Sequence, residues 1–414
     1  MRSGESSVEA WRPLDIAMIG QKGLPATFGG IEHHVEELGS RLAERGHTVR
    51  VYCRGSYVES DSATSGRPAK QAKYRGMVLR TAPTIGTKHL DAIVHSATST
   101  ALAMAAHSDV VHYHALGPGL LAPLPRYLSR AKVVLTVHGL DHQRGKWGRG
   151  AQAVLGTAHW MSGRIPDRTV VVSQTLQQHY ADEFGRTATY IPNGVDDPSV
   201  LAADQITERF GLTPGSYALF VGRLVPEKAP DQLLRAFANV PGDHRLVIVG
   251  DSSFSDTYTT ELKELGARDP RVLFTGFAFG DLLGELYRHA GVFVQPSLLE
   301  GLPLTLLEAA SYGVPVLASD IPPHLEVLGA SRPGRRTFRT GDVPALTAAL
   351  TAALAGSPTD AAAERAGAAA LRTDVLAGYS WDRATDELER LYLELAARRR
   401  FGQTAPAAAA GGAR

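Results

Sequence analysis

The chain has 414 residues, of which 44% are hydrophobic and 21% are charged, and this composition indicates a globular protein of about two or three domains. The 43 Lys and Arg residues nearly balance the 42 Asp and Glu residues, so the net charge gives no reason to expect a nucleic-acid partner. The single cysteine, Cys53, excludes an internal disulfide and a cysteine-rich zinc or iron–sulfur site.

Targeting signals are weak. Residues 1–13 lack the apolar core of a signal peptide and are predicted to be a disordered leader. No stretch approaches the roughly 18 uninterrupted apolar residues of a membrane-spanning helix. These patterns predict a cytoplasmic protein and leave peripheral contact with the inner membrane face open.

Short apolar runs alternate with helical patterns through the first half. A strand at residues 16–20 is followed by a Gly- and Pro-rich loop and by a helix over residues 31–45. Further strands are predicted at residues 48–54, 77–81, 109–114, 132–137 and 168–173. Because strands that alternate with helices form parallel sheets covered on both faces, residues 14–196 are predicted to be a Rossmann-like domain.

The turn-forming segment at residues 191–198 predicts a domain boundary, after which the alternation restarts. Strands are predicted at residues 217–221, 245–249, 272–274, 292–295 and 314–318. A second Rossmann-like domain therefore covers residues 197–380, with an Ala-rich helix over residues 345–371. A final helix at 381–400 precedes a low-complexity tail, 401–414, that we expect to be disordered. The fold class is α/β, and the expected ligand site is the cleft between the two sheets.

Two cations follow the first strand of the second domain. Arg223 and Lys228 lie in the segment Gly-Arg-Leu-Val-Pro-Glu-Lys, just past the strand end. A guanidinium forks onto phosphate oxygens and an ammonium acts as a point charge, so this pair suits a diphosphate. Taken alone, such a pair is more often solvated surface.

Two glutamates flank a predicted helix start. Glu300 precedes the turn Gly301-Leu302-Pro303, and Glu308 lies inside the helix that follows, with Pro303 predicted as its first residue. The amides of Leu304 and Thr305 would offer an anion site, and paired carboxylates can hold vicinal sugar hydroxyls.

The first domain offers weaker signals. Gly29 and Gly30 end a loop that leads into a helix, where glycines let the backbone approach a phosphate. The loop is neither a dinucleotide fingerprint nor a P-loop. His138 ends a strand at the expected ligand edge, although a buried structural histidine is the simpler interpretation. The 15 histidines form no recognised metal motif, so no metal and no cofactor are expected.

Together these motifs resemble the retaining GT-B glycosyltransferases of family 4. The pattern Gly-Arg-x4-Lys followed by Glu-x7-Glu is the most specific part, and the segments at residues 29–38, 136–139 and 191–196 add to it. The start Gly-Leu-Pro-Ala-x-Phe-Gly-Gly is similar to an exopolysaccharide and rhamnosyl-type subgroup. The resemblance implies a hexosyl-type transferase (EC 2.4) that uses a nucleoside-diphosphate sugar as co-substrate and needs no metal.

The resemblance also implies roles for individual residues. Arg223 and Lys228 would hold the donor diphosphate, helped by the amides of Leu304 and Thr305 and by the loop at Gly29 and Gly30. Glu308 would bind the ribose hydroxyls, Glu300 the transferred sugar, and His138 would lie near the reacting centre. The nucleobase would lie at Gly276 and Phe277, and the final helix would cross back to the first domain, with hinges near Val195 and Tyr379.

The sequence nominates no carboxylate nucleophile for double displacement, so front-face substitution with retention is the predicted mechanism. Two alternatives stay open: a sugar-nucleotide 2-epimerase on the same fold, and a non-catalytic nucleotide-sugar-binding protein. The acceptor is a hydroxyl, lipid-linked or on a natural product. The biosynthesis of exopolysaccharides, envelope glycoconjugates or glycosylated natural products would use such a reaction. Basic residues suggest docking to a lipid diphosphate or membrane: Arg67, Lys70, Lys73, Arg75, Arg144, Lys146 and Arg149.

Overall fold

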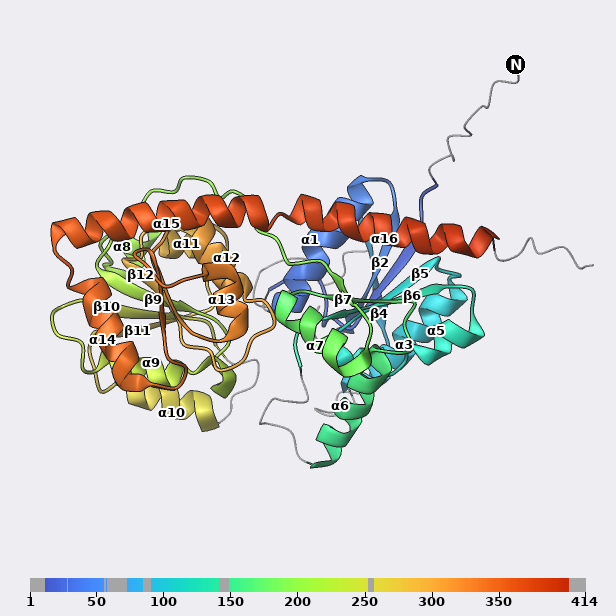
Figure 1. Cartoon of the computed structure of the whole chain (residues 1–414), viewed down its shortest axis with the longest axis horizontal. Coiled ribbons are helices and arrows are strands. Elements are labelled where there is room, and N and C mark those ends of the chain that lie inside the picture. Colours follow the sequence, from blue (N-terminus) through green and yellow to red (C-terminus); the bar gives the residue numbers. More distant parts are fainter. Residues whose placement is uncertain are drawn as a thin grey trace, which may run out of the picture. The chain divides into compact units, whose positions relative to one another are not determined.

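The computed structural model describes residues 12–27, 29–55, 57, 73–84, 91–140, 149–251 and 257–401. Two β-sheets, each accompanied by helices, form the fold (Figure 1). The chain divides into two compact units, one of residues 1–136, 157–169 and 385–414 and the other of residues 137–156 and 170–384. The predicted leader and tail lie almost wholly outside the described residues.

The first sheet has eight strands in the order β3-β4-β2-β1-β5-β6-β7-β8. β1 pairs in parallel with β2 and β5, and β3 is antiparallel to β4. All five residues of β5 are buried, as a sheet covered on both faces requires. The strands are Asp15–Ile19 (β1), Thr48–Arg54 (β2), Lys73–Tyr74 (β3), Met77–Ala82 (β4), Val110–His114 (β5), Lys132–Val137 (β6), Arg168–Val171 (β7) and Thr189–Tyr190 (β8).

The helices of this half form where the sequence has helical spacing and end signals. Val35, Leu38 and Leu42 of α1 are at most 1% exposed, so the helix packs one apolar stripe inward. Ser173 caps α7 by accepting from the amide of Leu176, and Gly185 ends that helix in the left-handed region. The helices are Gly30–Glu44 (α1), Asp91–Ala105 (α3), Leu116–Gly119 (α4), Pro123–Leu128 (α5), Arg149–Ser162 (α6) and Gln174–Phe184 (α7).

The second sheet has six parallel strands in the order β11-β10-β9-β12-β13-β14. Counted from β9, this is the doubly wound order 3-2-1-4-5-6, and its direction reverses between β9 and β12. Ligands of such sheets bind outside the carboxyl ends of the strands at that switch point. The strands are Tyr217–Val221 (β9), Arg245–Val249 (β10), Val272–Gly276 (β11), Val292–Gln295 (β12), Val316–Ser319 (β13) and Arg335–Phe338 (β14).

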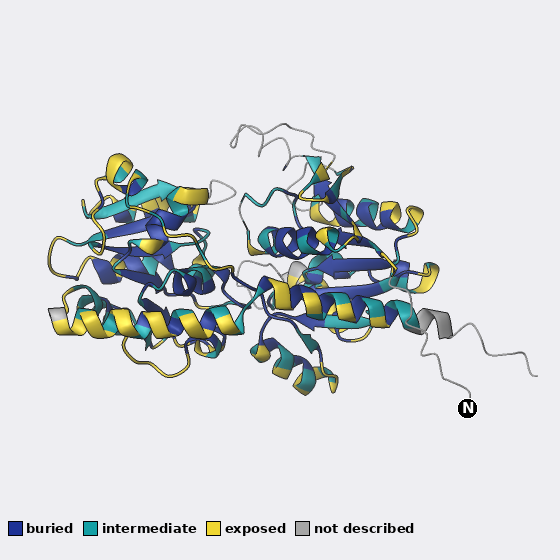
Figure 2. Ribbon diagram, turned by 90° about the horizontal axis from the view of Figure 1, so that it is seen from above, coloured by how far each residue is buried: buried dark blue, intermediate teal, exposed yellow. Residues whose placement is uncertain are grey.

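Helices around this sheet bury a core that includes Phe220, Phe237, Ile248 and Val294. The central strands of the two sheets, β1 and β5 in the first and β9 and β10 in the second, are almost wholly buried (Figure 2). No helix among the described residues is long and apolar enough to span a bilayer. The helices are Gln205–Phe210 (α8), the 3₁₀ turn Pro226–Lys228 (η2), Pro230–Phe237 (α9), Thr257–Gly266 (α10), Gly280–Arg288 (α11), Leu304–Ser311 (α12), Pro322–Leu328 (α13), Val343–Leu354 (α14), Pro358–Gly378 (α15) and Trp381–Phe401 (α16).

The Ala-rich region differs from the prediction, because it forms two helices, α14 and α15, in place of one over residues 345–371. Gly356 lies in the break. Ser357 then caps α15 reciprocally with Asp360, and a proline holds the first helical position. Capping energy therefore outweighs the helix propensity of the alanines.

Residues 385–401 of α16 belong to the first unit, where they pack against its strands and first helix. The hydroxyl of Tyr392 lies 2.5 Å from Nδ1 of His112 on β5, and Arg45 donates to Glu389 at 2.6 Å. Earlier in α16, Trp381 is 1% exposed. Within the second unit, the amide of Val195 donates to the carbonyl of Tyr379 at 3.0 Å, which joins the two segments predicted as hinges.

Protonation of His95 should make the first unit sensitive to acid. This α3 side chain is fully buried, and burial together with the Arg54 charge lowers its pKa to about 4. Between pH 6.5 and 4 the unfolded chain binds a proton that the folded chain does not, so stability falls as the pH falls through this window. Urea denaturation should show the wild type losing up to about 3 kcal/mol more than His95→Gln over this range. If the stability of the wild type and of His95→Gln fell in parallel over this range, a low pKa of His95 in the folded chain would be contradicted.

Candidate active site

The loop after β9 brings the predicted cations to the switch point of the second sheet. The amide of Leu224 donates to the carbonyl of Asp251, and a 3₁₀ turn closes at Lys228, whose amide donates to Val225. Arg223 is 37% exposed at its side chain and lies 3.9 Å from the Glu227 carboxylate. The amide of Leu298 donates to the carbonyl of Glu227 at 2.9 Å, so the loops after β9 and β12 are bonded to each other.

Lys228 and Glu300 form an ion pair between these two loops. Nζ of Lys228 lies 2.5 Å from Oε1 of Glu300, and the side chains are only 17% and 9% exposed. The same oxygen accepts from Nε2 of Gln295 at 2.9 Å and from the hydroxyl of Ser297 at 2.7 Å. Thr305 donates in turn to Oε1 of Gln295 at 3.3 Å. Residues predicted separately as diphosphate and sugar contacts are therefore in direct contact.

The second oxygen of Glu300 is left available. Among the described residues, all three donors bond Oε1 and none bonds Oε2. Burial alone would raise the pKa of Glu300, but the Lys228 charge and the hydrogen bonds from Lys228 and Ser297 to Oε1 lower it to about 2. The carboxylate is therefore ionised at neutral pH, with one oxygen held by the protein and the other able to accept from a ligand hydroxyl.

The N-terminus of α12 supplies free amides beside this carboxylate. The helix begins at Leu304, and Pro303 is its N-cap and not its first residue as predicted, because the backbone of Pro303 is extended. Leu306 and Leu307 donate to the carbonyl of Pro303, whereas no backbone acceptor within the described residues takes the amides of Leu304 and Thr305. Such unpaired amides at a helix start favour an anion.

Glu308 lies inside α12 and is half-buried. Its Oε2 accepts from the hydroxyl of Tyr287 at 2.8 Å, and the ring of Tyr287 stacks on Tyr312 at 5.5 Å. Burial and the Glu308 charge raise the pKa of Tyr287 well above its ordinary value, so the phenol stays protonated and remains a donor. Tyr287 thus fixes one carboxylate oxygen.

The segment after β6 lies against the turn that follows Glu300. Both belong to the second unit. A Cβ atom added to Gly301 would lie 1.8 Å from the carbonyl oxygen of His138 and 3.3 Å from the amide of Gly139. The structure therefore brings the backbone of His138 to the loop that carries Glu300, and only glycine fits between them.

An aromatic pair follows β11. The carbonyl of Gly276 accepts from the amide of Gly250 at 2.8 Å. The rings of Phe277 and Phe279 stack at 6.1 Å with 18° between their planes, and they are 36% and 43% exposed. An exposed pair of aromatic rings is a suitable surface for a nucleobase. Phe279 was not among the predicted residues.

Gly29 and Gly30 belong to the first unit, where glutamates of α1 hold the preceding loop. Oε1 of Glu32 accepts from the amide of Lys22 at 2.8 Å, and Oε2 of Glu36 accepts from the amide of Ala26 at 2.6 Å. Gly29 is the N-cap of α1 and has a φ of 112°. This region of backbone conformation is open to glycine and strained for other residues.

Replacing Gly29 should therefore destabilise the first unit. In Gly29→Ala the new Cβ would lie 2.1 Å from the Glu32 carboxylate, and the alanine backbone would have to keep a positive φ. Together these effects should cost about 1–3 kcal/mol of unfolding free energy. Denaturant titration measures this loss. Gly117→Ala is the matched control, because a Cβ there meets nothing within 4 Å. Equal stability of the two variants would refute the strain argument.

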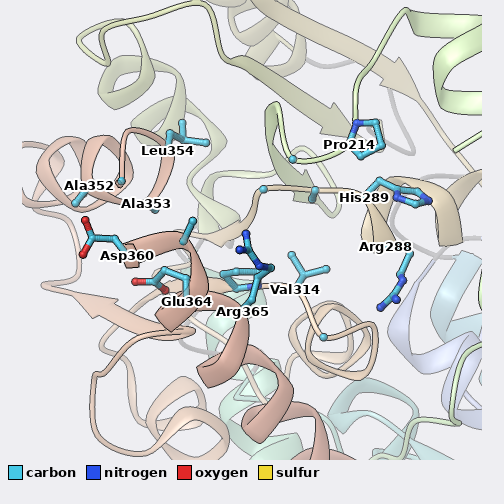
Figure 3. Close-up of a pocket in the computed structure, with 17 residues that line it drawn as sticks. Pro214, Arg288, His289, Val314, Ala352, Ala353, Leu354, Asp360, Glu364 and Arg365 are labelled. Atoms are coloured by element: carbon cyan, nitrogen blue, oxygen red, sulfur yellow. The ribbon is translucent and has the colours of Figure 1, made fainter. Parts of the chain in front are cut away.

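A cavity of about 540 Å³ lies elsewhere in the second unit (Figure 3). Its walls include Gly215, Gly291 and Val314, which precede β9, β12 and β13, together with Arg288 and Arg365. It is therefore at the amino ends of the strands, the edge opposite Lys228 and Glu300. None of the predicted site residues lines it.

Several residues of the site were missed by the sequence analysis. Gln295, Ser297, Tyr287 and Phe279 all sit next to predicted residues, but each lies in or beside an apolar run. The polar Gln295 at the end of a buried strand was the available signal, since a buried amide needs partners.

The doubly wound sheet, with cations and helix-end amides at its switch point, defines the class as an α/β protein of the doubly wound type, and these groups are suited to an anionic ligand. Residues 205–370 match the family model described as Glycosyl transferases group 1, and residues 28–197 match the one described as Glycosyltransferase Family 4. The chain therefore belongs to the group 1 glycosyltransferases (EC 2.4), and its two sheets, parallel except for β3, have the GT-B fold. The sequence resemblance is confirmed at this level.

Similar curated proteins carry related names. A GDP-mannose-dependent alpha-(1-6)-phosphatidylinositol monomannoside mannosyltransferase of Mycobacterium tuberculosis is 29% identical over 320 residues, which cover 72% of this chain and 78% of that protein. A D-inositol 3-phosphate glycosyltransferase of Geodermatophilus obscurus is 29% identical over 404 residues, which cover 88% of this chain and 84% of that protein.

Solved structures agree in fold. Sucrose-phosphate synthase from Thermosynechococcus elongatus has a TM-score of 0.77 at 21% identity and covers 92% of this chain and 99% of its own. Anabaena HepE in complex with UDP-glucose has a TM-score of 0.74 at 18% identity, and the match covers 92% of this chain and 100% of that chain. At these identities the likeness concerns the fold.

Proposed function

We propose that the chain is a retaining, metal-independent glycosyltransferase that moves a sugar from a nucleoside-diphosphate donor to a hydroxyl acceptor. The observation that carries the proposal is the Lys228–Glu300 ion pair at the switch point of the second sheet, with Oε2 of Glu300 left available. A cation for a diphosphate and an acceptor for a sugar hydroxyl lie side by side there.

The diphosphate is bound by Lys228 and Arg223, with the amides of Leu304 and Thr305. As the sugar leaves, negative charge grows on the diphosphate, and fixed donors stabilise it more in the transition state than in the ground state. Lys228 donates one hydrogen bond to Glu300, so it keeps two further N–H groups for phosphate oxygens. Gly29 and Gly30 stay predictions as additional phosphate contacts.

The rest of the donor follows from the neighbouring groups. Glu300 accepts from hydroxyls of the transferred sugar, and Glu308 from the ribose hydroxyls. The base stacks at Gly276 and Phe277, extended by Phe279. His138 lies beside the sugar, held through the close approach of its backbone to Gly301.

Front-face substitution is the proposed chemistry. The bond from the anomeric carbon to the phosphate oxygen breaks, the acceptor oxygen bonds to the same face, and the departing phosphate takes the acceptor's proton. This step needs neither a protein base nor a metal, because the departing phosphate accepts the proton. The configuration at the anomeric carbon is retained.

The acceptor is proposed from the relatives, which are named for inositol-containing substrates. A polyhydroxylated acceptor, free or lipid-linked, fits this similarity and a role in envelope glycoconjugate or exopolysaccharide synthesis. A natural-product aglycone, which the transfer would convert into a glycosylated natural product, is a further acceptor class. Peripheral docking at the cytoplasmic membrane face is part of the proposal. Of the basic residues predicted for docking, Arg75 is engaged by Glu36 and Glu37, whereas Arg67, Lys70, Arg144 and Lys146 lie outside the described residues.

The test incubates the full chain with GDP-mannose or UDP-glucose, with and without inositol and its phosphates, in the presence of EDTA. We expect one donor to raise the melting temperature and NMR of the product to show a retained anomeric configuration. An inverted product or a requirement for a divalent metal would overturn the mechanism. Epimerised donor without acceptor would favour a 2-epimerase, and donor binding without turnover a non-catalytic protein.

A further inference from the structure

A chain of buried hydrogen bonds lies behind Glu300. Ser297 follows β12, Ser319 ends β13, and His324 lies in the first turn of α13. All three residues are 0% exposed. The ion pair and its direct donors do not explain why a histidine is buried there.

The direction of each bond can be assigned. The hydroxyl of Ser297 donates to Oε1 of Glu300 at 2.7 Å, and the hydroxyl of Ser319 donates to the carbonyl of Ser297 at 2.5 Å. Nδ1 of His324 lies 2.9 Å from the carbonyl of Ser319 and 3.1 Å from its hydroxyl oxygen. A carbonyl only accepts, and the Ser319 hydrogen is already used. Nδ1 of His324 therefore carries the proton.

The ring is neutral. Burial lowers the pKa of His324 to about 4, against the opposing effect of the Glu300 charge. Its Nε2 is buried and has no hydrogen-bond partner among the described residues. Of the ring's two nitrogens, Nδ1 is therefore the one that hydrogen-bonds to the described part of the chain. A neutral ring leaves Lys228 as the charged partner of Glu300.

We propose that His324 is a positioning residue that acts through Ser319 and Ser297 to hold the Glu300 carboxylate, with Oε1 on Lys228 and Oε2 toward the transferred sugar. The inference rests on the proposed function, because it assigns Glu300 to the sugar. Misplacing a group that contacts the reacting substrate by about 1 Å can cost about 100-fold in rate.

The test compares His324→Leu, which removes the Nδ1 donor, with His324→Asn, whose amide can donate from nearly the same position. We expect kcat in His324→Leu to fall about 10- to 100-fold, while the Kd for UDP or GDP stays within twofold, because the chain holds the sugar contact and not the diphosphate. His324→Asn should recover most of kcat. His289→Leu is the control, since His289 bonds the Leu201 carbonyl at the opposite edge of the sheet.

Ser319→Ala keeps the ring and removes the link to Ser297, so it serves if His324→Leu does not fold. We expect the same loss of kcat in a variant that still unfolds cooperatively, at a somewhat lower melting temperature because the buried carbonyl of Ser297 loses its donor. Wild-type kcat in Ser319→Ala or in folded His324→Leu would overturn the inference, as would a loss of diphosphate affinity equal to the loss of kcat.

A crystal structure separates this inference from the proposed function, because it needs no substrate. We expect the distance from Nζ of Lys228 to Oε1 of Glu300 to exceed 3.5 Å in Ser319→Ala, beyond hydrogen-bond range. An unmoved carboxylate would refute the inference even if no donor were found. If the wild type transfers no sugar but the carboxylate moves, the proposed function fails and the positioning role stands.

Discussion

Lys228→Ala is expected to lower kcat at least about 100-fold and to weaken binding of the nucleoside diphosphate. The lysine supplies fixed positive charge where the departing diphosphate becomes more negative, and removing one such group typically costs about 3–4 kcal/mol of transition-state stabilisation. Truncation also leaves the Glu300 carboxylate, 9% exposed, without its ionic partner. Its pKa should therefore rise and the melting temperature fall. Steady-state kinetics and differential scanning calorimetry measure the two effects.

Lys132→Ala is the matched control for this experiment. Lys132 is 21% exposed, close to the 17% of Lys228, and lies 3.8 Å from Asp167 in the first unit. Lys132→Ala should leave kcat within about twofold, because a weak ion pair between two residues that have no assigned role in donor binding contributes little. If both variants kept wild-type kcat, Lys228 would have no part in catalysis.

Gly301→Ala is expected to abolish most activity through a single methyl group. The added Cβ would lie 1.8 Å from the His138 carbonyl, far inside van der Waals contact, and the obstacle is backbone that cannot rotate away. The loop that carries Glu300 must shift, at a cost of about 1–3 kcal/mol in stability. A displacement of about 1 Å at Glu300 should lower kcat roughly 100-fold. Kinetics and thermal unfolding of the purified variant measure both.

Gly378→Ala controls for a general effect of removing a glycine from the same unit. A Cβ at Gly378 meets nothing within 4 Å, and no positive φ is required there. This variant should match the wild type in kcat and melting temperature. Wild-type behaviour of Gly301→Ala would mean that His138 and the Glu300 loop do not meet in solution.

The sequence was sufficient to predict most of the strands, the helices that border the site and the loops that carry it, but it did not predict the short strands β3, β8 and β14. Short apolar runs and intervening amphipathic patterns depend on neighbours along the chain, and the loop after β9 and the helix after Pro303 lie where these patterns placed them. The capping signals at Ser357 were also present in the sequence. The single-helix prediction failed because alanine propensity was given more weight than Gly356, Ser357 and Pro358.

Contacts between distant segments could not be predicted in this way. Lys228 and Glu300 are 72 positions apart, and their pairing depends on β9 and β12 being neighbours at the switch point. The roles of Tyr287 and His324 likewise require knowledge of which helices border the site. A single sequence gives the period of each helix but does not say which buried polar side chain its inner face meets.

Calorimetric titration of the wild type, Lys228→Ala and Glu300→Gln with UDP, UDP-glucose, GDP and GDP-mannose tests the donor site most directly. We predict that Lys228→Ala weakens the binding of UDP or GDP, whichever the wild type binds more tightly, at least tenfold. Glu300→Gln should bind that diphosphate within about threefold of the wild type but lose the added affinity contributed by the sugar. Diphosphate affinity equal to the wild type in Lys228→Ala would contradict the account.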